Sequence, residues 1–109
     1  MSDDLPGALA EIAAIVGREA ALDLAEMHGG RRIYIPRPQG LGGAHQLVTA
    51  LGDRDAVAVA MEMSGQHVDV PFARRALARR LAERGHRPTE IARRLGISLS
   101  AAARYAKAG

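Results

Sequence analysis

Hydrophobic and polar positions along the chain follow a helical period in its first part. Between residues 9 and 16, apolar residues recur at the spacing i, i+3, i+4 and i+7. The same stripe recurs 35 residues later, starting at Ala44. A second helical stripe, at residues 21–25, is also repeated 35 residues further on. The pattern therefore predicts two pairs of amphipathic helices.

Each predicted helix pair is followed by a short segment in which apolar and polar residues alternate. "GGRRIYIPR" begins at Gly29, and "SGQHVDVPF" begins at Ser64. This period of two is typical of a half-buried strand. The apolar face would carry Ile33, Ile35, Val68 and Val70, and the other face Arg32, Tyr34, His67 and Asp69.

A lone strand leaves its backbone donors and acceptors unpaired, so each copy needs a partner. We expect the two strands to form a small antiparallel ribbon whose apolar face packs on the helices. The sequence leaves open whether they pair within one chain or across a homodimer. The predicted fold class is mainly α, with tandem helix-helix-strand repeats at about residues 9–36 and 44–71. Residues 1–70 would then form an assembly region, and "PRPQGLGG", from Pro36 to Gly43, a connector between the copies.

From Pro71 onward the period is purely helical, and proline is well placed at a helix start. The apolar face of this helix would carry Leu77, Ala78, Leu81 and Ala82. Its opposite face would carry Arg75, Arg79, Arg80 and Arg84, which extend a basic surface.

The final segment, "RPTEIARRLGISLSAAARYAKAG", has the spacing of a helix-turn-helix motif. A short helix buries Ile91, Ala92 and Leu95, and Gly96 supplies the turn. Ile97 closes the core beneath the turn, and Ser98 caps a last helix. That helix would run from about Leu99 to Ala108, with Ala102 and Tyr105 facing inward. Residues 71–109 are therefore predicted to be a DNA-binding region.

The distribution of charge supports this interpretation. Residues 1–71 hold 5 basic and 10 acidic side chains, whereas residues 72–109 hold 10 basic and 2 acidic ones. The net charge of +3 is therefore the sum of −5 in residues 1–71 and +8 in residues 72–109. Such asymmetry is typical of a polyanion-binding end on an acidic scaffold.

Candidate DNA contacts follow from the helix-turn-helix prediction. Arginines before and within the first helix, together with the amides that open the last helix, are candidate phosphate ligands. On the last helix, Arg104 has the fork geometry for a bidentate guanine contact, and Ser100 and Ala101 could touch base edges. The predicted contact residues are Arg87, Thr89, Arg93, Arg94, Ser98, Ser100, Ala101, Arg104 and Lys107.

The sequence offers little that would support catalysis or metal binding. It has no cysteine, and its four histidines, 28, 45, 67 and 86, lack the close spacing of local metal ligands. The methionines near His28, which are Met27, Met61 and Met63, are interpreted as core residues. We expect no enzyme, no cofactor and no metal.

Two segments, "GGRRIYIPR" and "EIARRLGIS", resemble the Mor transcription activators of Mu-like phages. In that family, a helical dimerisation region ends in a "GG…YIPR" strand, and a helix and a helix-turn-helix follow it. The resemblance covers most of residues 8–107, but here a second, degenerate copy intervenes. That copy has Ser64 for the first glycine, Asp69 for the tyrosine, and Phe72 where the first copy has Arg37. The resemblance implies a phage or prophage transcriptional activator with RNA polymerase as a partner.

Two functions remain as hypotheses. The first is a small regulator that binds duplex DNA as a monomer or homodimer, in the bacterial cytoplasm and on the nucleoid. The second is a non-enzymatic assembly or adaptor protein that works through the duplicated helical region. Without a basic leader or a run of 18 apolar residues, we expect no membrane association.

Overall fold

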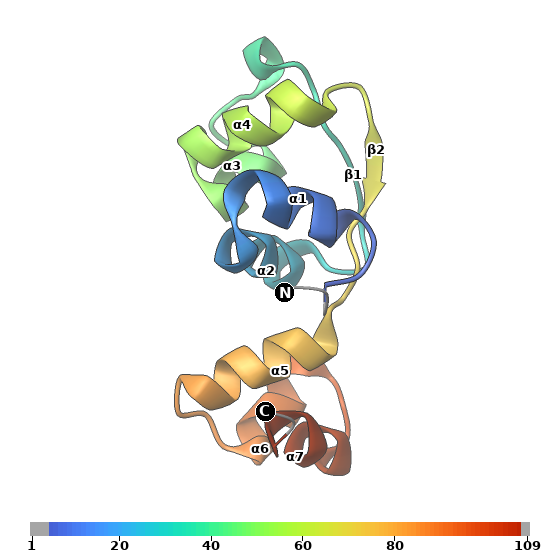
Figure 1. The fold of residues 1–109 in the computed structure, drawn as a ribbon, viewed down its shortest axis with the longest axis vertical. Helices are drawn as coiled ribbons and strands as arrows, with labels where there is room; N and C mark the ends of the chain where they lie inside the picture. The colour runs from blue at the N-terminus through green and yellow to red at the C-terminus, as the bar shows by residue number, and fades with distance from the viewer. Residues whose placement is uncertain (1–4, 108–109) are drawn as a thin grey trace. The chain divides into compact units, whose positions relative to one another are not determined.

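The computed structural model describes residues 5–107, which form seven α-helices, one short 3-10 helix and two strands. The two strands make a small antiparallel sheet, so the predicted fold class is confirmed at this level. The chain divides into two units, residues 1–72 and 73–109 (Figure 1).

The first unit contains four helices and both strands. Its elements are α1 (Ala8–Val16), α2 (Arg18–His28), β1 (Arg32–Tyr34), the 3-10 helix η1 (Pro38–Gly40), α3 (Gln46–Leu51), α4 (Asp53–Met63) and β2 (His67–Asp69). The elements of the second unit are α5 (Arg74–Glu83), α6 (Pro88–Leu95) and α7 (Leu99–Lys107).

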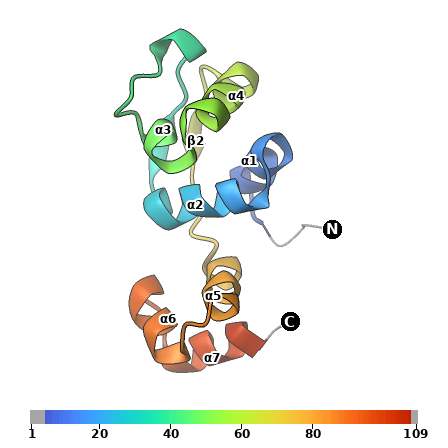
Figure 2. The same cartoon turned by 90° about the vertical axis from the view of Figure 1, so that its left-hand side faces the viewer.

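The four helices of the first unit pack in a ring. α1 contacts α2 and α4, and α3 contacts the same two helices. A single glycine joins the helices of each pair, Gly17 with φ 100° and Gly52 with φ 86°. Because these backbone angles suit only glycine, the chain can end one helix and begin the next without a loop. The ribbon lies along one side of the ring, as Figures 1 and 2 show from two directions.

β1 and β2 pair with each other within the chain. Ile33 lies opposite Val68, and the pairs Arg32–Asp69 and Tyr34–His67 flank it. Backbone hydrogen bonds continue the pairing beyond both strand ends. They join Gly30 N–H to the Val70 carbonyl at 2.7 Å, Gly65 N–H to Ile35 at 2.7 Å, Val70 N–H to Arg31 at 2.8 Å and Ile35 N–H to Gln66 at 2.9 Å.

The ribbon has one buried and one exposed face, as the alternation predicts. Its four apolar side chains, Ile33, Ile35, Val68 and Val70, are at most 4% exposed. On the other face, Arg32 donates to Asp69 from Nε at 2.8 Å and from Nη2 at 3.3 Å. These bonds lower the pKa of the Asp69 carboxyl group. The rings of Tyr34 and His67 lie 5.0 Å apart.

Burial on α2 and α4 follows a narrow stripe, which corrects the interpretation of the methionines. Met63 is buried, but Met27 is 50% exposed and Met61 is 70% exposed. On α2 the buried stripe ends at His28, and on α4 it ends at Met63. A residue one or two positions from such a stripe is rotated by about 100–200° around the helix, so it points away from the core.

Two predicted helix starts are also wrong. α3 begins at Gln46, and Ala44 is exposed in a turn. His45 caps this helix because its Nδ1 accepts the Leu47 N–H at 3.0 Å. The helix expected from Pro71 begins at Arg74, because Ala73 before it has a left-handed backbone with φ 52° and cannot belong to the helix. The expected helix end at Ala108 lies outside the described residues.

Close packing explains the glycine pair that opens the first strand segment. A Cβ atom on Gly29 would lie 2.6 Å from the Ala25 carbonyl oxygen and 3.2 Å from that of Pro71. The aromatic ring of Phe72 covers Gly30, where a Cβ atom would lie 2.4 Å from the ring. By contrast, a Cβ built on Gly65, 35 positions after Gly30, has no atom of residues 5–107 within 4 Å apart from its chain neighbours.

We predict that Gly29→Ala lowers the free energy of unfolding by about 1–3 kcal/mol, because the new methyl group meets backbone atoms that cannot rotate away. Ser64→Ala is the matched control, since Ser64 lies 35 residues later with a similar φ of −59°. It should change stability by no more than about 0.5 kcal/mol. Urea denaturation followed by circular dichroism measures both, and equal losses would contradict the packing argument.

His28 is a buried histidine in the last turn of α2. It is 9% exposed, and among residues 5–107 neither ring nitrogen has a hydrogen-bond partner. Burial, together with the positive charge of Arg31, lowers its pKa below the usual 6.5. Met63, the residue 35 positions later, is also buried and has no charge to lose or gain.

We predict that His28 makes folding sensitive to mild acid. Because its folded pKa is lowered, the unfolded chain binds a proton first, and stability falls as the pH drops below about 6.5. His28→Met should remove this part of the pH dependence. Thermal unfolding across this pH range compares the variant with wild type and with His67→Met, which removes an exposed imidazole. Unchanged pH dependence in His28→Met would contradict the prediction.

Candidate nucleic-acid interface

The three helices of the second unit share one small core. Ala78, Leu81, Ile91 and Ala102 form its buried centre. Leu95, Ile97 and Tyr105 are among the partly buried residues packed against it. The small side chains of Ala78 and Ala102 let the helices approach closely. Each of the three helices contacts the other two.

Gly96 forms the turn between α6 and α7. Its left-handed backbone, with φ 67° and ψ 35°, suits glycine better than other residues. The N–H groups of Gly96 and Ile97 both donate to the Ala92 carbonyl, the latter at 3.1 Å, and so satisfy the end of α6. The side chain of Ile97 can then pack on the core directly after the turn.

Ser98 caps the start of α7. Its Oγ accepts the Ala101 N–H at 3.0 Å, which satisfies one of the free amides of the first turn. The other N–H groups there remain oriented along the helix axis, where they favour negative charge.

α6 begins with Arg87 as its N-cap and Pro88 as its first residue. The Glu90 carboxylate accepts the Arg87 N–H at 2.9 Å, and this bond lowers its pKa. Glu90 also lies 3.7 Å from Nδ1 of His86. A negative charge therefore lies close to Arg87, which weakens this arginine as a phosphate ligand.

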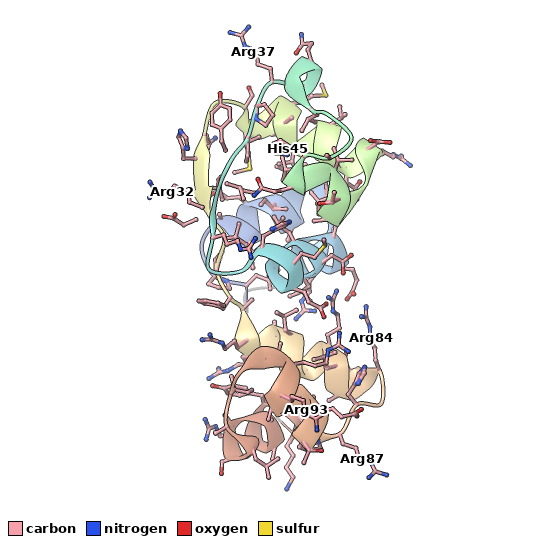
Figure 3. All side chains as sticks on the ribbon, turned by 180° about the vertical axis from the view of Figure 1, so that it is seen from behind. Arg32, Arg37, His45, Arg84, Arg87 and Arg93 are labelled. Carbon is pink, nitrogen blue, oxygen red and sulfur yellow. The ribbon has the colours of Figure 1, made fainter. Side chains whose placement is uncertain are left out.

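Most predicted contact residues lie on the surface of this unit. Arg87, Thr89, Arg93, Arg94, Ser98, Ser100, Arg104 and Lys107 are exposed, and Ala101 is half-buried. Ser100, Arg104 and Lys107 share one stripe of α7 through their spacing of i, i+4 and i+7. The side chain of Arg87 extends outward from the backbone of its own unit (Figure 3).

The position of Arg80 corrects the expected basic surface. Its side chain is only 3% exposed, so it is not available on an open face. Arg80 lies three and four residues after Leu77 and Ala76, which are also buried. Arg79 is half-buried, and Arg75 and Arg84 are exposed.

One cluster of side chains could not be predicted from the sequence. The guanidinium carbons of Arg75 and Arg104 lie 5.4 Å and 5.2 Å from the centre of the Tyr105 ring. The spacing along α7 places Arg104 beside Tyr105, but nothing in the sequence indicates that a residue of α5 reaches the same ring.

Metal-binding clusters and membrane-spanning helices were not found among residues 5–107. No three histidine, aspartate or glutamate side chains come together there as metal ligands would. No helix in that part of the chain is both long enough and apolar enough to cross a bilayer. Comparisons with protein-family models, curated proteins and solved structures find no match to this chain.

We predict that Ser98→Ala destabilises the unit by about 1 kcal/mol, because the start of α7 loses its side-chain cap. Ser100→Ala provides the control, since Ser100 is exposed within the helix and should contribute at most about 0.5 kcal/mol. Amide hydrogen exchange at the start of α7 measures the difference. Equal protection in the two variants would show that the cap does not matter.

Proposed function

We propose that α6 and α7 form a helix-turn-helix, and that the protein is a small transcriptional regulator that binds duplex DNA. One observation supports this most strongly. The Gly96 turn, the Ser98 cap and the small shared core hold α7 across α6, with the stripe of Ser100, Arg104 and Lys107 exposed. In such motifs the second helix enters the major groove.

Charge supports duplex DNA as the partner. Residues 72–109 carry 10 basic side chains against Glu83 and Glu90. Neutralising phosphates with such residues releases counterions, which gives affinity that does not depend on sequence. The outward side chains near the start of α7 are small, so direct readout of bases has few donors and acceptors to use.

The ribbon is proposed to organise the protein rather than to contact DNA. Arg32, the first residue of β1, is engaged by Asp69, which leaves this face without a uniform positive charge. We propose that the first unit is a fused pseudo-dimer of two helix-helix-strand copies. Supporting this, the hydrogen bonds flanking the strands occur in two sets related by a shift of 35 residues.

The resemblance to Mor activators adds the expected regulatory role. It rests on the two segments that begin at Gly29 and Glu90, and it implies activation with RNA polymerase as a partner. Because both strands belong to one chain, each ribbon carries one candidate DNA-binding unit. Occupation of a two-fold symmetric operator would then require a second molecule.

We predict that the protein binds random-sequence duplex DNA with strong salt dependence. Neutralising about four to six phosphates gives a slope of log K against log salt near −4 to −5. Arg93→Ala/Arg94→Ala should make the slope shallower by about 1–2. Fluorescence anisotropy at several salt concentrations measures both slopes. The matched control is Arg31→Ala/Arg37→Ala, which removes two charges from the first unit and should leave the slope unchanged.

Absence of binding at low salt would contradict the proposal. The adaptor hypothesis, in which the helical first unit binds a protein partner, would then become the better explanation of the chain.

A further inference from the structure

Two positive charges are held against one aromatic ring in the second unit. Arg75 comes from the first turn of α5, whereas Arg104 and Tyr105 are neighbours on α7. Both guanidinium groups lie within 5.4 Å of the ring centre, so they are separated by no more than the sum of the two distances. The negative face of a phenol ring attracts each cation and partly offsets their mutual repulsion.

Nearby carboxylates do not neutralise this cluster. Within residues 5–107, neither Arg75 nor Arg104 is paired with a carboxylate. From residue 73 onward the acidic side chains are Glu83 and Glu90. Glu83 lies eight residues after Arg75 on the same helix, which corresponds to about 12 Å. Glu90 is engaged at the start of α6, where it accepts the Arg87 N–H.

An anion is the ligand that such an arrangement favours. A guanidinium group presents several donors in a planar fork that matches the oxygen atoms of a phosphate. Two guanidinium groups gathered at one ring repel each other until a negative charge lies beside them. Arg75 and Arg104 are exposed, so both guanidinium groups are open to a phosphate from solvent.

We propose that Arg75, Tyr105 and Arg104 form a binding site for a backbone phosphate of duplex DNA. Tyr105 is a positioning residue that holds both guanidinium groups and links α5 to α7. The inference rests on the proposed function and extends its contact surface to α5. It also changes the role of Arg104, which becomes a phosphate ligand that fixes the orientation of α7 rather than a reader of guanine.

Substitution of Arg75 tests the site. Each lost phosphate contact makes the slope of log K against log salt shallower by about 0.9, and this is the expected result for Arg75→Gln. The control is Arg54→Gln, which removes the same charge from an exposed side chain of α4 in the first unit. Arg54 is not a predicted DNA contact, and the slope should stay as in wild type.

Tyr105 variants separate positioning from packing. Tyr105→Phe keeps the aromatic face and should bind DNA as wild type does. Tyr105→Leu keeps an apolar residue in the core but loses the face, and affinity should fall by about 3- to 10-fold. Circular dichroism and thermal unfolding verify that each variant is folded. Equal affinity of the Phe and Leu variants would overturn the positioning role.

Arg104→Gln distinguishes a phosphate contact from a base contact. Loss of a phosphate ligand lowers affinity by the same factor for duplexes of different sequence, whereas loss of a base reader lowers it most for one sequence. A loss confined to one sequence would overturn the assignment of Arg104.

The outcomes also separate this site from the proposed function. If wild type does not bind duplex DNA, both proposals fail. If wild type binds and Arg93→Ala/Arg94→Ala makes the slope shallower, but Arg75→Gln behaves as Arg54→Gln does, the site is wrong and DNA binding stands. Titration with inorganic phosphate, followed by nuclear magnetic resonance, tests the other source of this anion. Saturable binding that perturbs Tyr105, with no effect of Arg75→Gln on the DNA slope, would indicate a site for free phosphate.

Discussion

Antiparallel pairing between β1 and β2 is the constraint on which the first unit depends. Three-residue strands have too few backbone hydrogen bonds and too little apolar surface to be stable alone. Pairing them within the chain brings their four apolar side chains to one face, and that face can be buried only against the ring of helices. The single-glycine joints at Gly17 and Gly52 keep each helix pair compact enough to form the ring. The strand pair is therefore stable only if its apolar face is buried on the helical ring, and the ring forms only if the two glycine joints are tight.

The second unit solves a different problem, which is to hold two short helices against α5 with a small core. α6 has 8 residues and α7 has 9, so neither is long enough to be stable as an isolated helix. Small residues at the centre of the core allow close approach, and the bonds to the Ala92 carbonyl end α6 without a loop. The polar atoms at this turn are thereby satisfied while the outward side chains stay exposed. Ser98 and Ser100 at the start of α7 are accordingly exposed.

Much of the fold follows from the sequence, because the spacing of apolar residues predicts which segments are helices or strands and the glycines mark where those segments end. The alternation in the two strand segments was enough to predict which face of the ribbon is buried. Ala44 and Met61 show the limit of that reasoning. A helical stripe predicts a face, but where the helix begins, and how wide its buried face is, depend on the elements packed against it.

The candidate site was less predictable for the same reason. Exposure of the α7 stripe follows from the spacing of its apolar residues. Burial of Arg80 does not, since an arginine is rarely buried and no local pattern separates Arg80 from the exposed arginines of α5. Likewise, the approach of Arg75 to Tyr105 depends on how α5 and α7 cross. Such contacts arise from tertiary packing between segments 30 residues apart, for which local patterns contain no signal.

Pairing of the two strands within one chain also determines how the first unit responds to dilution. A ribbon made from two separate chains dissociates as the protein concentration falls, because its assembly is bimolecular. Here the connector and the two helices between the strands tether one strand to the other. The effective concentration of one strand for its partner is then fixed by this tether and not by the amount of protein present. The helical ring can therefore form in a single molecule, at a copy number too low to sustain a dimer.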